Sequence, residues 1–112
     1  MTEINVTGEF VGWYESLDEQ DSDAVYRVVG LLETLGVRLG FPHSSAIEGS
    51  AHALRELRVQ SGGRPLRILY AFDPKRQAVL LLGGDKTGRD RFYEEMIPRA
   101  ERLWKEYLAE LE

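Results

Sequence analysis

The chain has 112 residues, of which 43% are hydrophobic and 29% charged, so we expect one small folded domain over residues 1–112 rather than a disordered chain. It contains no cysteine, which excludes disulfides, zinc–thiolate sites and thiol nucleophiles. The formal net charge of −5 on its face disfavours a nucleic-acid ligand.

The distribution of charge along the chain changes that interpretation. Residues 1–54 carry two basic and nine acidic residues, whereas residues 55–102 carry eleven basic and seven acidic ones. A basic middle segment therefore lies between acidic ends, as a local phosphate site would require. Chance scatter of charges in a small chain explains the same pattern equally well.

The sequence also bears on location. No segment approaches the roughly 18–20 continuous apolar residues of a membrane span. The N-terminal stretch MTEINVTGEF lacks the basic start and long apolar run of a signal peptide. We therefore expect a cytoplasmic protein.

The first half of the chain predicts one strand followed by two helices. Residues 3–7 alternate between polar and apolar side chains, and residues 8–17 place aromatic residues at helical spacing. A second helix ends at Gly36 and carries one apolar stripe. That stripe consists of Val25, Val28, Val29, Leu32 and Leu35. Residues 36–52 are rich in glycine and serine and are expected to form a loop.

The second half predicts three strands joined by tight turns and then a helix. The strands are expected at 54–60, 64–72 and 78–83, the turns at 61–63 and 73–77, and the helix at about 89–110. The third strand is apolar throughout, which is typical of a central strand. We therefore predict an α+β fold in the order β-α-α-β-β-β-α, with a small antiparallel sheet and helices packed on one face.

The meander brings three cations close together. Arg58 and Arg67 lie on neighbouring strands, and Lys86 follows the third. If Arg58 and Arg67 share one sheet face, that face is electropositive and suits a phosphate. The same residues also fit a solvated sheet face on which Glu56 pairs with an arginine. Tyr93, at the start of the last helix, fits the core and the site equally well.

The stretch GGDKTG at 83–88 is not a nucleotide-binding loop. A Walker motif requires a Gly-Lys pair with a further glycine five positions before that glycine, and here Asp85 rather than glycine directly precedes Lys86. The two histidines, His43 and His52, are weak indications of a metal site, and His52 is a weak candidate for a general acid or base. We therefore expect no metal and no cofactor.

At this point the motifs resemble a known family. The sequence is similar to the HigB-like, phage-derived branch of the RelE/ParE superfamily, whose members are toxins of type II toxin–antitoxin systems. The resemblance covers nearly the whole chain. It rests on the segments 56–58 (ELR), 63–74 (GRPLRILYAFDP), 83–88 (GGDKTG) and 97–100 (IPRA), and on the start 7–10 (TGEF).

The resemblance implies a toxin that enters the ribosome and cuts mRNA without metal or cofactor. A ribose 2′-hydroxyl attacks the adjacent phosphate and leaves a cyclic phosphate and a 5′-hydroxyl. The implied catalytic residues are Arg67, Arg58, Lys86 and Tyr93. The implied RNA-binding residues are Arg55, Arg64 and Arg89. The implied partners are the ribosome, mRNA and a cognate antitoxin of helix-turn-helix type, with no membrane.

The chain departs from that family in two respects. It is acidic overall, whereas ribosome-dependent nucleases of this kind are strongly basic, and it offers no clear general base. Two alternatives therefore stay open. One is a toxin of the ParE kind that inhibits DNA gyrase without cutting RNA, and the other is an inactive relative that binds only an antitoxin.

Overall fold

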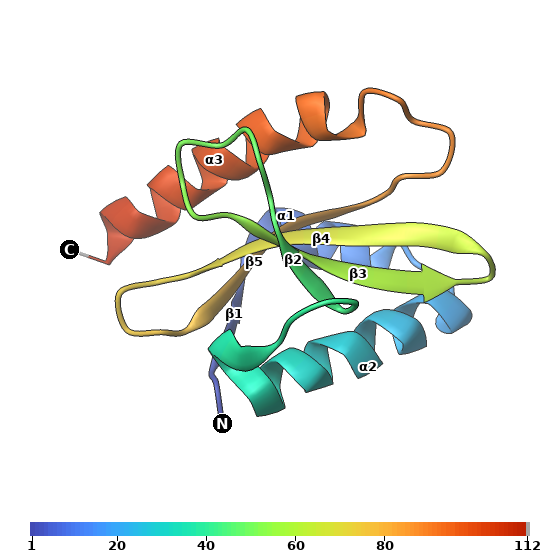
Figure 1. Ribbon diagram of the computed structural model, residues 1–112, viewed down its shortest axis with the longest axis horizontal. Helices are drawn as coiled ribbons and strands as arrows, with labels where there is room; N and C mark the ends of the chain where they lie inside the picture. The colour runs from blue at the N-terminus through green and yellow to red at the C-terminus, as the bar shows by residue number, and fades with distance from the viewer. Residues whose placement is uncertain (112) are drawn as a thin grey trace.

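The computed structural model describes residues 1–111 (Figure 1). In chain order the elements are β1 (Ile4–Val6), α1 (Gly8–Glu15), α2 (Glu19–Leu35), the 3-10 helix η1 (Gly36–Arg38), β2 (Ser44–Ala46), β3 (Arg55–Ser61), β4 (Arg64–Phe72), β5 (Ala78–Asp85) and α3 (Phe92–Glu110). Over this described range, no helix has both the length and the apolar character needed to cross a membrane.

The strands form one mixed sheet in the order β1-β5-β4-β3-β2. β1 runs parallel to β5, and all other neighbours are antiparallel. The meander of β3, β4 and β5 confirms the three strands and two turns that the sequence predicts. β5 lies inside the sheet, between β1 and β4, as its apolar sequence indicates.

The segment 36–52 contains two short elements, η1 and β2, where the sequence predicts a loop. In β2, Ser44 lies opposite Leu57 and Ala46 opposite Arg55. A strand of three residues is too short to show an alternating pattern, and its two serines do not favour extended structure. Pairing with β3, rather than local sequence preference, therefore defines β2.

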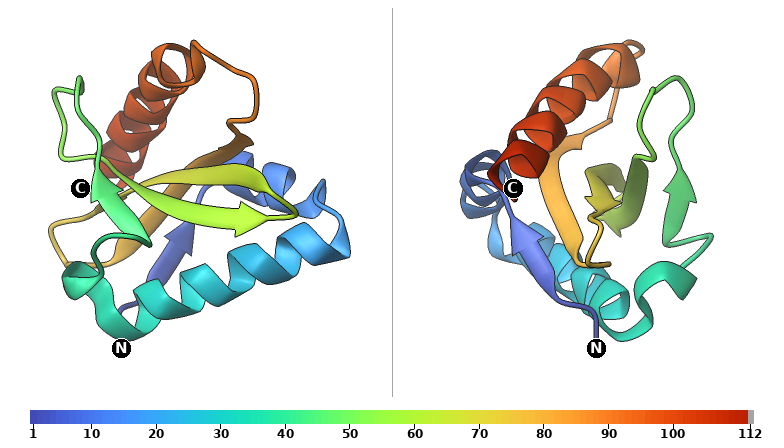
Figure 2. Two further views of the ribbon diagram at one scale, coloured as in Figure 1. Left: turned by 45° about the vertical axis from the view of Figure 1, so that its right-hand side comes forward. Right: turned by 90° about the vertical axis from the view of Figure 1, so that its left-hand side faces the viewer.

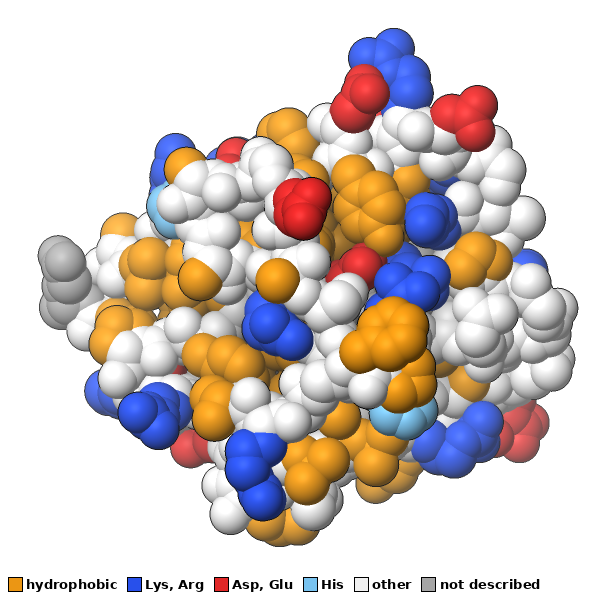
Figure 3. Space-filling model, in the orientation of Figure 1, with side chains coloured by type: hydrophobic (Ala, Val, Ile, Leu, Met, Phe, Trp, Pro, Cys, Tyr) orange, Lys and Arg blue, Asp and Glu red, His pale blue; other side chains and the backbone are white. Residues whose placement is uncertain are grey.

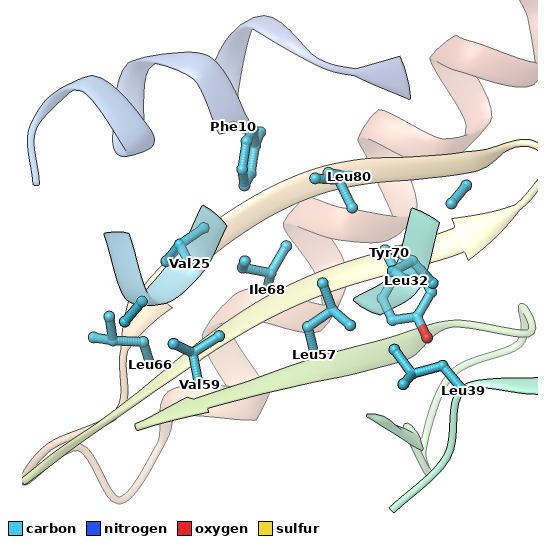
Figure 4. Packing of buried hydrophobic residues seen from close by; sticks show 12 residues of the cluster. Phe10, Val25, Leu32, Leu39, Leu57, Val59, Leu66, Ile68, Tyr70 and Leu80 are labelled. Atoms are coloured by element: carbon cyan, nitrogen blue, oxygen red, sulfur yellow. The ribbon is translucent and has the colours of Figure 1, made fainter. Parts of the chain in front are cut away.

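Hydrophobic side chains pack on both faces of the sheet. α1 and α2 cover one face, and α3 covers the other (Figures 1 and 2). On the first face the core contains Phe10, Val25, Leu32, Leu57, Ile68, Tyr70 and Leu80 (Figure 4). On the second face it contains Leu69, Ala71, Leu81, Leu82, Phe92, Met96 and Trp104.

The α+β class is therefore confirmed, but the placement of the helices differs from the expectation. α3 lies on the face opposite α1 and α2, so the helices do not share one face. The reason is visible in β4 and β5, whose side chains are apolar in both directions. Such strands require cover on both faces, because either uncovered face would leave a large apolar surface in water.

A bulge in β5 determines what lies above its two glycines. Leu69 pairs with Leu82 and Tyr70 pairs with Leu80, which leaves Leu81 as an extra residue. Beyond the bulge, Gly83 lies under the Trp13 ring of α1, and Gly84 lies under Phe92 at the start of α3. A Cβ atom at Gly83 would overlap the indole ring, so this glycine permits the close approach of α1.

Replacing Gly83 with alanine is expected to lower the free energy of unfolding by about 1–3 kcal/mol, because the new methyl group overpacks against Trp13. Urea denaturation measures the change. The matched control is Gly12→Ala within α1, where a Cβ meets nothing within 4 Å. That change should raise stability by about 0.5–1 kcal/mol. Equal stability of Gly83→Ala and the wild type would contradict the assigned contact.

Candidate functional site

Glu56 of β3 is the centre of a polar cluster on the α3 face of the sheet. Its Oε1 accepts a hydrogen bond of 2.6 Å from the Tyr93 hydroxyl, and its Oε2 accepts one of 3.0 Å from the Ser45 hydroxyl. The Arg58 guanidinium lies 3.4 Å from Oε2, and Arg67 Nε lies 3.5 Å from Oε1. Glu56 is only 6% exposed, so its charge depends on these partners.

The strand register explains why these side chains meet. Arg58 lies directly opposite Arg67 in the β3–β4 ladder, so both point to the same face. Glu56 precedes Arg58 by two residues and therefore shares that face. The start of α3 lies over the same face and supplies Tyr93. The structure thus confirms the shared face of the two arginines that the alternating pattern predicts.

Arg67 is nearly buried and incompletely paired. It is 5% exposed, and its Nη1 donates to the carbonyl oxygen of Leu66 at 3.0 Å. Its Nε lies within ion-pair distance of Glu56 but, among the described residues, makes no hydrogen bond. Two arginines side by side repel each other, and the carboxylate of Glu56 offsets that repulsion. Leu66 and Glu56 therefore hold Arg67 in place, and its buried Nε faces Glu56.

Two cation–aromatic pairs lie beside this cluster. Lys86 Nζ is 5.2 Å from the centre of the Tyr93 ring, and Arg58 Cζ is 5.4 Å from the centre of the Phe41 ring. The structure thus brings Arg58, Lys86 and Tyr93 together around Glu56. Figure 3 shows basic side chains beside hydrophobic ones on the face seen in Figure 1.

Tyr93 is the residue whose ionisation the cluster perturbs. Burial raises the pKa of its hydroxyl, and the hydrogen bond to the Glu56 carboxylate raises this pKa further. The phenol is therefore protonated at neutral pH and acts as a hydrogen-bond donor to Glu56. This contact assigns Tyr93 to the site, where the sequence left core and site open.

A cleft adjoins the cluster beside residues 58–60 of β3, beyond the part of the strand that pairs with β2. It has a volume of about 440 Å³ and lies between β3, α2 and the segment before β2. Its lining residues are Ala24, Arg27, Val28, Pro42, His43, Arg58, Val59, Gln60 and Arg67. Among the described residues that line it there is no carboxylate, so the cleft is electropositive. Arg58 and Arg67 belong to both the cleft and the Glu56 cluster.

The structure places the three predicted RNA-binding arginines away from this cluster. Arg55 points to the α2 face, where its Nε donates to Ser44 Oγ at 3.2 Å and to the Tyr70 hydroxyl at 3.3 Å. Arg89 lies over the Phe92 ring and pairs with a carboxylate of α3 at 3.3 Å. Arg55 is therefore engaged within the protein, whereas Arg89 makes its contacts at the surface.

Arg64 has a structural role at the β3–β4 hairpin. It pairs with the buried carboxylate of Asp21, which also accepts a 2.6 Å hydrogen bond from Ser61. A second pair joins Arg64 to Asp85 at 3.3 Å. These contacts connect the hairpin to the start of α2. The hydrogen bond from Ser61, together with Arg64, holds the pKa of Asp21 below its ordinary value of 3.8.

This lowered pKa predicts a loss of stability in acid. A carboxyl group whose pKa is lower in the folded state stabilises the fold above its unfolded pKa, and that contribution disappears as the pH falls through the folded pKa. The Asp21→Asn variant should therefore lose less unfolding free energy than the wild type between pH 6 and pH 3. Urea denaturation at several pH values measures both. Identical acid dependence would contradict the assignment.

Sequence reasoning missed two features of the site. The sequence predicted Glu56 only as a pairing partner for an arginine on a solvated sheet face. The structure shows the pairing, but the carboxylate is buried. Its spacing of two from Arg58 was the available signal. Ser45 and Phe41 fell within a segment expected to be a loop, and no local pattern marks either residue.

No metal centre is evident within residues 1–111, since no group of three or more histidine, aspartate or glutamate side chains converges there. His43 lines the electropositive cleft. His52 lies in the loop before β3, where its backbone amide donates a hydrogen bond of 3.1 Å to the hydroxyl oxygen of Ser50. The structure therefore does not bring the two histidines into one site.

The fold is that of RelE-type toxins. The chain is similar to the toxin fold in the archaeal RelE–RelB complex of Pyrococcus horikoshii, with a TM-score of 0.57 and 19% identity, over 79% of this chain and 97% of the other. It is also similar to a metal-bound toxin from Helicobacter pylori, with a TM-score of 0.53 and 18% identity, over 80% of this chain and 99% of the other.

Sequence comparison gives the family. Residues 12–105 match the family described as phage-derived protein Gp49-like. Two Mycobacterium tuberculosis proteins whose names designate them HigB toxins, HigB2 and HigB3, are each 41% identical, over 89% and 87% of this chain. The chain spans 51% of the length of HigB2 and 85% of HigB3. The chain belongs to the Gp49-like family, the HigB-like branch of the RelE/ParE toxin superfamily.

Proposed function

We propose that this chain is the toxin of a type II toxin–antitoxin pair and that it cuts mRNA on the ribosome. The observation that carries the proposal is the pair Arg58 and Arg67, which flank the Glu56 carboxylate and both line the electropositive cleft. Family membership and the names of the HigB relatives support it. We take residues 1–112 to act as one toxin domain in the cytoplasm, where translation takes place.

The cluster suits cleavage by the neighbouring ribose hydroxyl. We assign Glu56 as the base that removes the proton from the 2′-oxygen, which then bonds to phosphorus as the bond to the 5′-oxygen breaks. The 5′-oxygen takes a proton from solvent. Arg67, with Arg58, stabilises the negative charge that develops on the phosphoryl oxygens. Fixed cations of the protein can supply this stabilisation without a metal or cofactor.

The remaining members have supporting roles in this scheme. Tyr93 donates to Glu56 and so orients the carboxylate, and Lys86 adds positive charge beside the Tyr93 ring. Arg55 and Arg64 are held by contacts to buried groups, so we assign them to the fold rather than to RNA, whereas the exposed Arg89 stays a proposed RNA contact.

We propose a cognate antitoxin as the protein partner. The RelE-like structure from Pyrococcus horikoshii is a complex of RelE with RelB, which supports such pairing for this fold. The resemblance of the sequence implies an antitoxin of the helix-turn-helix type. Co-expression with a small helix-turn-helix protein encoded beside this gene should restore growth to cells that the chain inhibits, and failure of such a protein to bind the chain would contradict the pairing.

A purified translation reaction tests the enzymatic proposal. The protein is added to a defined mRNA with and without ribosomes, and the ends of the fragments are mapped. Codon-phased cuts that need ribosomes and leave a cyclic phosphate are expected. Intact mRNA under these conditions would overturn the proposal. A parallel gyrase supercoiling assay then separates a gyrase inhibitor, which blocks supercoiling, from an inactive antitoxin-binding relative, which does not.

A further inference from the structure

Phe41 stands out among the exposed side chains. It lies between η1 and β2 and is 77% exposed, an unfavourable state for a phenyl ring. Single exposed apolar residues are common and need no explanation by themselves. Phe41 differs because the Arg58 guanidinium lies over its ring, with Cζ 5.4 Å from the ring centre. One ring face thus meets a cation of the proposed site, and the side chain remains open to solvent.

The surroundings of Phe41 indicate a ligand with both a flat ring and negative charge. Pro42 and His43, which follow it directly, line the electropositive cleft together with Arg27, Arg58 and Arg67. The cleft volume of about 440 Å³ lies within the range of small-ligand sites. Because Arg58 touches the Phe41 ring, the Glu56 carboxylate and this cleft, the ring stands directly beside the proposed cleavage site.

We propose that Phe41 stacks against a base of single-stranded RNA, next to the nucleotide whose phosphate meets Arg67. The base lies on the ring face turned away from Arg58, and the adjoining phosphate enters the cleft toward Arg27 and His43. An aromatic ring beside a basic groove is how proteins hold single strands without reading their sequence, since every base has a flat face. The cleavage context of this inference rests on the proposed function, whereas the stacking contact does not.

The first experiment measures mRNA cleavage on ribosomes by four variants. Phe41→Ala and Phe41→Leu, which remove the ring, are expected to cut about tenfold more slowly, a typical effect of losing one base–aromatic stack. Phe41→Trp should retain activity because a larger ring replaces the phenyl group. Tyr26→Ala is the control, since Tyr26 of α2 is 73% exposed and lies outside the cleft lining. Wild-type rates for both Phe41→Ala and Phe41→Leu would overturn the inference.

The second experiment does not require cleavage. Fluorescence of Phe41→Trp, corrected for Trp13 and Trp104 by the wild type, is titrated with a short 2′-O-methyl RNA and with an abasic backbone of equal length. Quenching by the RNA but not by the abasic strand supports stacking, and equal or absent quenching overturns it. If the wild type does not cut mRNA, the proposed function fails while this titration still decides the stacking contact.

Discussion

Replacing Arg67 with alanine is expected to lower the rate of mRNA cleavage by about 10²–10³-fold, the usual effect of removing one preorganised donor from a developing oxyanion. Arg67 is buried, is fixed by Leu66 and Glu56, and lines the electropositive cleft. A fixed guanidinium needs little reorganisation as charge develops on the phosphoryl oxygens. Cleavage rates under single-turnover conditions on programmed ribosomes measure the effect.

Matched variants separate charge from geometry at this position. Arg67→Lys retains the positive charge but loses the planar fork of donors, so its rate should fall between those of Arg67→Ala and the wild type. Lys105→Ala removes a cation from the exposed side of α3 and should cut like the wild type. Urea denaturation must show that Arg67→Ala is folded at the assay temperature. A folded Arg67→Ala that cuts at the wild-type rate would refute the assignment of Arg67.

The Glu56→Gln variant is expected to cut mRNA about 10²–10⁴-fold more slowly, because a side-chain amide cannot take the proton of the 2′-hydroxyl. The amide oxygen can still accept a hydrogen bond from Tyr93 or Ser45, so much of the packing is retained. The loss should appear in kcat rather than in KM, since the proposed role of Glu56 is at the reacting hydroxyl rather than at a distant part of the substrate.

The opposite result would identify a purely structural carboxylate. If Glu56 served only to neutralise Arg58 and Arg67, the Gln variant would bind RNA phosphate more tightly and cut at an undiminished kcat. Glu33→Gln provides the control, because Glu33 is an exposed carboxylate of α2 that lies outside the cleft lining and outside the cluster around Glu56. This variant should leave both kcat and KM unchanged.

Local sequence patterns predicted the three-stranded meander and the side of the strand on which Arg58 and Arg67 each lie. Strand alternation and tight turns depend on residues that are adjacent in the sequence, so they can be predicted from it. The alternation in 54–60 and 64–72 gave the side of its own strand on which each arginine lies, and the strand register then places Arg58 opposite Arg67 on one face. The same reasoning could not place α3, since the stretch 78–82 is apolar on both sides and does not indicate which helix covers which face. The one-residue bulge at Leu81 leaves no trace in the sequence LLLGG.

Whether a basic side chain is free or paired also depends on residues distant in the sequence. Arg64 resembles a free basic residue in the sequence, but Asp21, 43 positions away, holds it in the structure. Tyr93 could be assigned only once its hydroxyl was seen 2.6 Å from Glu56, 37 positions earlier. Phe41 became a candidate RNA-stacking residue only because the structure places the Arg58 side chain over its ring. Such partners follow from tertiary packing, which short-range patterns do not encode.

The four partners of Glu56 have a consequence for shortened chains. Ser45, Arg58, Arg67 and Tyr93 belong to β2, β3, β4 and α3, so the environment of the carboxylate draws on four separate elements. A chain truncated before α3 would keep both arginines and the meander, but it would lose the Tyr93 hydroxyl and the cover over that sheet face. The candidate site is therefore a property of the nearly complete fold, and no excised hairpin can reproduce it.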